Sequence, residues 1–552
     1  MVRVHVEPAA GYDKFLSVRV AYDRVEETEM EFFVASWRPG RYVLQHFAAG
    51  VIDFQARSAD GAPLKVRKAS KDSWKIAAGA RAVVVSYKFN ASLLDAGSTY
   101  LGENFWILNP VNFVGFTRPG LEQRHELTVS GADPTWTIAT SLERHASGVF
   151  VAENFDELAD SPLIVSPHLQ KRSFQTRGVN FNVHFCHPSR VDDEIWRYAL
   201  ENFRKIVEVQ IQVFGECPVR NYDYLFCFVP LEIRHAVEHA KSALFVLPQN
   251  SIASESAAKS KLLPISAHET WHIWNVKSIR PKEMTPYDYT REPTTDLHWF
   301  TEGVTDYYTQ YSLLKAGIIS RESFVSYFEN LFASLDNNPA ARFLSPAQSS
   351  LDSWLTGSPY AHPAHRISFY SLGSRVGFLL DLHMRTLSAG KAGLDDLFRL
   401  LYRRYYKQSK GIDLKALADA FGELTGQSFD AFCDKFIYGA GPPDYDYVFG
   451  PSPMKISASY ESTDFLTQIG VVKASSLGSG KYVVETTAPG SPAEKRGVGA
   501  GTALFQEDGV WKAQIGERTV ELRFSPDELL KNVRYAFVYS PDNPLIEAWL
   551  GR

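Results

Sequence analysis

The segment HETWH carries the strongest chemical signal in the sequence, because its residue types and spacing suit a metal ion. His268 and His272 are four residues apart, so on a helix both imidazoles project from one face about one turn apart. Two imidazoles at this spacing can bind one zinc ion, and Glu269 lies beside them where it can act as a general base for water. The alternative is a surface helix in which the pattern arises by coincidence.

A catalytic zinc site needs a third protein ligand and one open position. In LHWFTEGVTDYYTQY, Glu302 follows His272 by 30 residues and has apolar and aromatic neighbours at helical spacing. A carboxylate on such a face is not expected to be buried without a partner. Asp306, four residues further along, can accept the free N–H of a ligand imidazole. We predict Glu302 as the third ligand and Asp306 as its neighbouring support; solvated helix carboxylates are the alternatives.

These residues need a rigid frame, and the 552-residue chain is long enough for several domains. Its composition, 45% hydrophobic and 22% charged, is that of a globular protein. Residues 1–172 read as β-rich, with Gly- and Pro-punctuated strands. Residues 173–448 show mostly helical patterns, and residues 455–552 return to short strands with one short helix at about 525–534. The predicted class is therefore multidomain α+β. Helices are expected at about 263–276, 296–316, 320–335, 368–387, 392–407 and 412–422.

The charge pattern and the ends of the chain exclude some classes of protein. With 58 basic and 63 acidic residues, the chain lacks the basic excess typical of nucleic-acid binders. It contains no apolar run of about 18 residues, so no membrane span is expected. The N-terminus alternates like a strand without a signal stretch, which favours a cytoplasmic protein, or a periplasmic or secreted one if a signal has been removed. Four cysteines without a CxxC pair indicate buried thiols.

The two metal motifs resemble those of a known family. HETWHIWNVKSIRP followed by WFTEGVTDYY is similar to the glycyl aminopeptidase family of zinc peptidases, and SWRPGRY, ELADSP and LDDLFRLLYRRYY extend the resemblance over nearly the whole chain. It implies an N-terminal β domain at 1–172, a thermolysin-like catalytic domain at 173–448 and a PDZ-like domain at 455–552. It also implies that His268, His272 and Glu302 bind zinc, that Glu269 is the base and that Asp306 supports a ligand.

Two further site residues come from the same resemblance. ISFYSLG is similar to the family's YY-KG stretch and puts Tyr370 at the place of the tyrosine that hydrogen-bonds the oxyanion in related aminopeptidases, although Phe369 and Leu372 depart from the pattern. A phenol that keeps its proton at neutral pH suits that role. A core aromatic is the alternative for Tyr370.

IRHAVEHAKSALF resembles the family's GGLEH--S strand, which implies that Glu238 holds the free amine of the substrate. A fixed carboxylate at one end of a cleft would pair with an ammonium group and set an exopeptidase register. The family's two glycines are His235 and Ala236 here, so a side chain stands where backbone would approach the substrate. A structural acid on an edge strand is the alternative for Glu238.

The last region resembles a PDZ domain loosely, through FLTQIGVVKAS and APGSPAEKRGVGAGTAL, with Thr502 in place of the usual Asp. Two roles are open for it: a cap on the catalytic domain, or a module that binds peptide C-termini. The sequence as a whole predicts a zinc aminopeptidase that acts on peptides, with neither nucleic acid nor membrane as partner. The resemblance implies that it releases Gly or Ala from the N-terminus. The alternatives are a zinc endopeptidase or oligopeptidase, and an inactive scaffold that binds peptides through the PDZ-like domain.

Overall fold

The computed structural model describes residues 1–551 except 80, 357, 359, 361 and 363–365. The chain divides into two compact units. The first consists of Met1–Thr295, Tyr308–Ile318 and Phe398–Asp413, and the second of Asp296–Tyr307, Ile319–Leu397 and Leu414–Arg552. Among the described residues, no helix is both long enough and apolar enough to cross a membrane.

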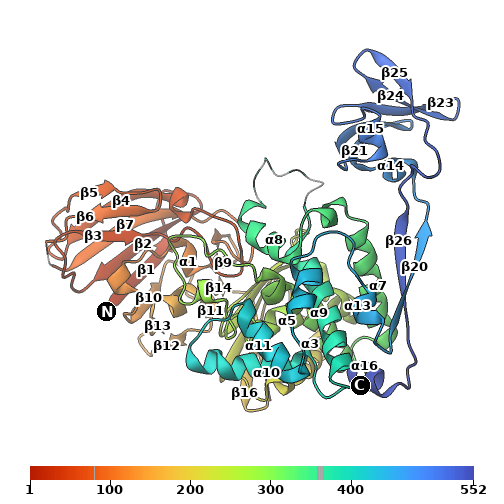
Figure 1. The fold of residues 1–552 in the computed structure, drawn as a ribbon. Coiled ribbons are helices and arrows are strands. Elements are labelled where there is room, and N and C mark those ends of the chain that lie inside the picture. Colours follow the sequence, from red (N-terminus) through yellow and green to blue (C-terminus); the bar gives the residue numbers. More distant parts are fainter. Residues whose placement is uncertain (80, 357, 359, 361, 363–365, 552) are drawn as a thin grey trace. The chain divides into compact units, whose positions relative to one another are not determined.

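The N-terminal part of the first unit is built from three sheets around one apolar core (Figure 1). The long strands Val2–Pro8, Phe15–Tyr22 and Val83–Asn90 alternate buried with more exposed side chains, because one face of their sheet meets the core. The seven-stranded sheet has the order β12 (Glu143–Arg144), β13 (Phe150–Ala152), β10 (His125–Val129), β1 (Val2–Pro8), β2 (Phe15–Tyr22), β7 (Val83–Asn90) and β4 (Val51–Ser58). The three-stranded sheet consists of β3 (Met30–Phe33), β6 (Ser73–Ile76) and β5 (Val66–Lys68), and the four-stranded sheet of β11 (Thr137–Ala139), β14 (Leu163–Ser166), β9 (Trp106–Leu108) and β8 (Tyr100–Leu101).

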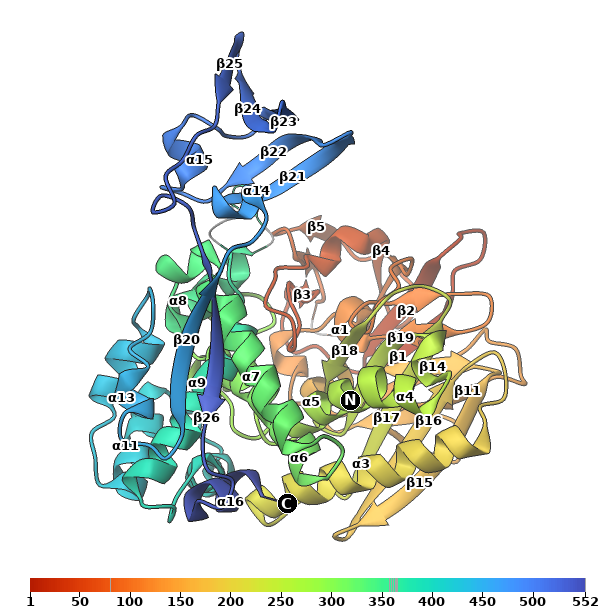
Figure 2. The same cartoon turned by 90° about the vertical axis from the view of Figure 1, so that its right-hand side faces the viewer.

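A five-stranded mixed sheet follows in the same unit, and helix α3 (Asp193–Phe214) lies along one of its faces (Figure 2). The order of its strands is β15 (Leu169–Thr176), β16 (Val179–Cys186), β17 (Asn221–Val229), β19 (Ser242–Pro248) and β18 (His235–Glu238). The ring of Trp196 on α3 stacks on Phe185 of β16 with centroids 4.1 Å apart. Strand β18 is an edge of this sheet, so its outer backbone groups are not used by a neighbouring strand of the sheet.

The second unit is mostly helical around aromatic side chains. Its elements include the π-helical turn η6 (Trp299–Gly303), the start of α6 (Val304–Lys315), α7 (Arg321–Asp336), α8 (Pro346–Leu351), α9 (Phe369–Leu387), the start of α10 (Leu394–Arg404), α11 (Leu414–Thr425) and α16 (Pro544–Leu550). Phe378 of α9 packs against Phe328 of α7 and Trp549 of α16, with centroids 4.7 and 5.1 Å away.

The C-terminal part of the second unit is again β-structure. Strands β20 (Lys455–Glu461) and β26 (Asn532–Val538) pair as a two-stranded ribbon beside α7 (Figures 1 and 2). Asn337 exchanges two hydrogen bonds with the backbone of Val533, which ties this ribbon to the end of α7. The ribbon leads into and out of a five-stranded sheet of β21 (Val471–Gly478), β22 (Lys481–Thr487), β23 (Ala503–Glu507), β24 (Val510–Ile515) and β25 (Arg518–Glu521).

The observed fold confirms the predicted class: β-rich sheets at the N-terminus, a central helical region and β-sheets at the C-terminus. Two local predictions are wrong. The helix expected at 263–276 is α5 (Leu263–Trp271), which ends at His272 and passes into turns. No helix forms at 525–534, because residues from Asn532 onward pair with β20 instead.

Candidate metal centre

Helix α5 holds both histidines of HETWH at its carboxyl end. His268 lies in its last turn, and His272 is the residue at which it ends. Their ring centroids are 4.7 Å apart, as the four-residue spacing predicts. His272 Nδ1 is 2.6 Å from the carbonyl oxygen of Asn275. With Nδ1–H donating to that oxygen, the lone pair of Nε2 is left for a metal ion.

Buried hydrogen bonds fix α5 on the elements of the first unit. Gln210 of α3 donates to the carbonyl oxygen of Ala267 at 2.8 Å. The hydroxyl groups of Tyr224 on β17 and Thr270 on α5 are 2.7 Å apart. Because both contacts are buried, the helix that carries the imidazoles is held on two sides.

Glu302 projects from the π-helical turn η6, a geometry that often marks functional sites. Two glycines set the position of this turn: a Cβ on Gly373 of α9 would lie 2.0 Å from the carbonyl oxygen of Trp299, and one on Gly303 would lie 2.4 Å from the Cα of Gly373. Only glycine lets the two backbones approach so closely. Burial lowers the pKa of His298, at the start of the turn, to about 3 although Glu302 opposes this, so the ring is neutral.

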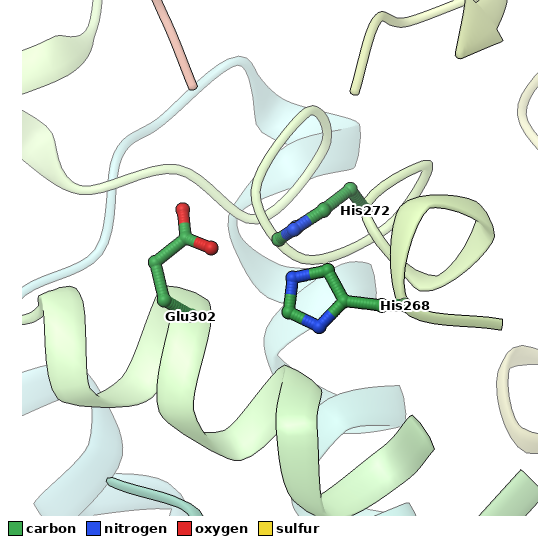
Figure 3. Close-up of side chains that lie close together, drawn as sticks. All are labelled: His268, His272 and Glu302. Atoms are coloured by element: carbon green, nitrogen blue, oxygen red, sulfur yellow. The ribbon is translucent and has the colours of Figure 1, made fainter. Parts of the chain in front are cut away.

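The structure brings the three predicted ligands together. One ligand atom from each of His268, His272 and Glu302 lies within 4.8 Å of the others, and Figure 3 shows the two imidazoles and the carboxylate turned toward one another. His272 and Glu302 are buried, whereas His268 is half-buried, so the cluster is open at one ligand.

The donor set fits the metal that the sequence predicts. Two imidazole nitrogens and one carboxylate oxygen are ligands that zinc accepts, and three protein ligands leave one position of a tetrahedral ion for water or substrate. The hydrogen bond at His272 Nδ1 adds the orienting contact that metal-binding histidines usually have. The site is therefore a candidate for a catalytic rather than a closed structural metal.

A second group of side chains lies against the first. Ligand atoms of Glu238, Glu269 and His272 also lie within 4.8 Å of one another, and all three residues are buried. Within the described part of the chain, Glu238 Oε1 is buried and has no hydrogen-bond partner. The ammonium group of Lys277 is 4.0 Å from this oxygen, beyond hydrogen-bond distance. Because a buried carboxylate oxygen without a partner is unfavourable, this one is suited to a donor that arrives from outside.

A buried ion-pair network of Asp160, Lys277 and His239 lies next to Glu238. Asp160 accepts hydrogen bonds from Lys277 at 2.9 Å, from the backbone N–H of Ala240 at 2.7 Å and from His239 at 3.0 Å. Burial alone would raise the pKa of Asp160, but Lys277 and these hydrogen bonds hold it well below its usual range. Burial alone would lower the pKa of Lys277, but Asp160 and Glu238 keep it above its usual value. Lys277 is therefore a fixed positive charge beside Glu238.

The sequence did not assign a role to this network. Asp160 lies in ELADSP and Lys277 in WNVKSIRP, two segments that served only to support the resemblance. The signal that could have found the network is a lysine among apolar side chains, five residues after a predicted metal ligand, because a buried lysine needs a partner.

On β18, His235 stands where the family has a glycine, but its side chain points away from the candidate site. His235 Nδ1 accepts the backbone N–H of Ala96 at 3.2 Å and lies 3.6 Å from Asp95. Side chains alternate along a strand, so Ala236, and not His235, shares the face of Glu238. Compared with the two glycines of the family pattern, the substitution at position 236 therefore adds only the methyl group of Ala236 on the face of Glu238.

Tyr370 and Asp306 lie in the first turns of their helices. Tyr370 is the second residue of α9, where its N–H donates to Ser368 Oγ at 3.2 Å and its ring stacks on Phe369. Asp306 is half-buried in the first turn of α6. Both therefore stand within a turn or so of the Gly303–Gly373 approach that positions Glu302. Their chemical roles stay predictions.

Comparisons with known proteins identify the family of the chain. A family model described as the peptidase M61 N-terminal domain matches residues 3–167, and one described as M61 glycyl aminopeptidase matches residues 261–376. No curated protein matches the chain. Among solved structures, an aminopeptidase N family protein from Idiomarina loihiensis is similar over 100% of both chains, with a TM-score of 0.86 and 21% identity. At that identity the likeness speaks for the fold alone.

Proposed function

Because the chain belongs to the M61 glycyl aminopeptidase family, we propose that it is a zinc-dependent aminopeptidase that removes small N-terminal residues from peptides. Membership of a peptidase family makes it a hydrolase of peptides. The observation that carries the finer proposal is the buried Oε1 of Glu238, which no described residue hydrogen-bonds and which lies beside Glu269 and His272.

In this proposal His268, His272 and Glu302 hold the zinc ion, and Asp306 supports the ligand set. Bound zinc supplies a Lewis acid and a nucleophile at neutral pH. Glu269 accepts the proton of the attacking water and passes it to the leaving amine. Tyr370 donates a hydrogen bond from its phenol group to the oxyanion of the tetrahedral intermediate.

Charge supports Glu238 as the site for a substrate ammonium group. Lys277 is paired with Asp160 at 2.9 Å and lies 4.0 Å from Glu238 Oε1, beyond hydrogen-bond distance. A substrate ammonium group would supply the hydrogen-bond donor that Glu238 Oε1 lacks, together with a positive charge opposite the carboxylate. A peptide with a blocked N-terminus lacks the positive charge and offers only a neutral amide N–H, so a free N-terminus is favoured over internal cleavage.

The test is the variant Glu269→Gln, with Glu283→Gln at an exposed position as its control. Metal content and the cleavage of Gly- and Ala-anilides are measured before and after chelation and after zinc is added back. Glu269→Gln should keep its zinc and lose activity by about 10²–10⁴-fold, while Glu283→Gln matches wild type. Undiminished cleavage by Glu269→Gln would remove Glu269 as the base. Equal cleavage of free and N-acetylated peptides by wild type would favour the endopeptidase alternative.

A further inference from the structure

A turn of the N-terminal β region reaches the carboxylate of Glu238. Residues 38–41 form this turn: Arg38 and Arg41 bridge across it, and Gly40 adopts a φ of +79°. A Cβ on Gly40 would lie 2.4 Å from Glu238 Oε2 and 3.0 Å from Oε1 and Cδ. Real Cβ atoms do not approach another atom as closely as 2.4 Å, so the carboxylate occupies the space that any other residue at position 40 would need.

The 38–41 turn is held firmly in place. Trp37 is fully buried, and its indole N–H donates to the carbonyl oxygen of Asp288 at 2.8 Å. The guanidinium of Arg38 lies over Gly97, where a Cβ would be only 1.7 Å from Nη2. The backbone N–H of Ser36, just before the turn, donates to the carbonyl oxygen of Tyr289 at 2.8 Å. A turn fixed by these contacts cannot swing away from Glu238 to make room.

The two carboxylate oxygens of Glu238 thus have different surroundings. Its Oε2 lies nearest to the position of a Gly40 Cβ, at 2.4 Å, whereas the ammonium group of Lys277 is 4.0 Å from Oε1, beyond hydrogen-bond distance. Among the described residues, Oε1 has no hydrogen-bond partner, so an unused lone pair remains there. That is an arrangement for a small donor such as an ammonium group, with backbone closing the other side of the carboxylate.

We propose that Gly40 is a positioning residue for substrate recognition. The 38–41 turn holds the carboxylate of Glu238 in the orientation that accepts the N-terminal ammonium group of a peptide. The same turn blocks the Oε2 side of the carboxylate, so that no residues of a longer peptide can extend past it. The N-terminal β region thereby contributes to the exopeptidase register, although the reacting groups lie outside it. This inference rests on the proposed aminopeptidase function.

The experiment compares Gly40→Ala with Gly61→Ala. Gly61 has a φ of +88°, and no atom lies within 4 Å of the position that a Cβ would take there, so it reports the strain of an alanine at positive φ without the contact. A displaced carboxylate should lower kcat/KM for Gly-anilide by about 10²-fold, because misplacement near 1 Å has effects of that size. The loss should lie mainly in KM, with zinc content unchanged. Gly61→Ala should match wild type in KM.

Glu238→Asp supplies the rescue, since it withdraws the carboxylate by one methylene group. Its loss of kcat/KM should be clearly smaller in the Gly40→Ala background than in wild type, which a double-mutant cycle detects. If Gly40→Ala does not fold, Trp37→Phe, which removes the hydrogen bond to Asp288, should raise KM in the same way. Equal KM for Gly40→Ala (or Trp37→Phe) and wild type, or single effects that simply multiply, would overturn the inference. An inactive wild type would instead refute the proposed function itself.

Discussion

The proposed metal ligands and the proposed amine site at Glu238 are built in opposite ways. The metal ligands stand on short helical segments, two of them four residues apart on α5. The pocket around Glu238 combines an edge strand, a turn some 200 residues earlier in the sequence and the Lys277–Asp160 pair. Local spacing therefore brings the two imidazoles together, whereas long-range contacts define the surroundings of Glu238.

This difference indicates which substitutions should disrupt each region. The metal ligands depend on the identity of three side chains and on one close backbone approach, Gly303 to Gly373. The amine site depends on buried charges that stabilise one another only while all are present. Substitutions in the two regions should consequently change different measured quantities.

Removing a metal ligand should have the largest effect. Glu302→Ala leaves two imidazoles, and zinc affinity should fall by more than about 100-fold, since even residues that only support a ligand contribute 10–100-fold. Cleavage of Gly-anilide should be lost with the metal. Zinc content after dialysis checks this, with Glu201→Ala at an exposed pair on α3 as the control. Full zinc occupancy in Glu302→Ala would exclude Glu302 as a ligand.

Breaking the ion-pair network should destabilise the protein without touching a ligand. Lys277→Met leaves Asp160 and Glu238 buried without their cation, which costs about 3–5 kcal/mol. The exposed pair of Lys241 and Glu157 provides the control, because Lys241→Met should cost at most about 1 kcal/mol. Urea unfolding measures both free energies. Equal stability of the two variants would mean that the Lys277–Asp160 pair does not support the pocket.

Neutralising Glu238 should affect the amine site and leave the metal ligands unchanged. Glu238→Gln keeps the shape of the side chain but weakens its bond to an ammonium group, and charge-assisted hydrogen bonds contribute about 1.5–3 kcal/mol, which is about 10–100-fold in kcat/KM. Zinc content and the cleavage of N-acetylated peptides should stay at the wild-type level. An unchanged ratio of free to blocked substrate cleavage would count against the amine site.

The close backbone approach near Glu302 can be tested with paired glycines. Gly373→Ala forces a Cβ against the carbonyl of Trp299 and should cost about 1–3 kcal/mol. Gly422→Ala, in α11, makes only an ordinary 3.5 Å contact and should stabilise the protein by about 0.4–1 kcal/mol. Thermal unfolding of the two variants should shift in opposite directions; shifts of the same sign would show that the approach does not constrain this turn.

The smallest expected effect is the acid sensitivity of the network. The pKa of Asp160 is lowered in the folded protein from its ordinary value of 3.8. A depressed carboxyl pKa stabilises the fold above the unfolded-state value, and this stabilisation is lost as pH falls below about 4 toward the folded-state value. The melting temperature should therefore fall less between pH 6 and pH 3 in Asp160→Asn than in wild type. Parallel curves would contradict the role of this group.

Much of the site could be predicted from the sequence because its signals are local. The spacing of His268 and His272 needs only helical geometry, and Glu302 was found from an acid on an aromatic-rich helix face. Glu238 and Tyr370 were reached only through the resemblance, since neither has a distinctive local pattern. Gly40 follows Pro39, and a Pro-Gly pair is typical of a turn, but nothing local indicates that Glu238, 198 residues later, fills the space at the Cα of Gly40.

The fold shows the same limit. Patterns of hydrophobic residues predicted most long helices, such as α7 and α9, within a residue or two. They failed at 525–534, where residues 525–531 form a turn and a loop and residues from Asn532 onward pair with β20, 71 to 83 residues earlier. They also placed the end of α5 too late, because the hydrogen bond from His272 to the carbonyl of Asn275 belongs to a turn that apolar periodicity does not reveal.

The most direct test of the account is anomalous X-ray diffraction at the zinc edge from crystals of the zinc-loaded protein. The account predicts one strong peak, about 2.0–2.2 Å from a nitrogen of His268, a nitrogen of His272 and a carboxylate oxygen of Glu302. A peak elsewhere in the molecule, or none among these three side chains, would contradict it.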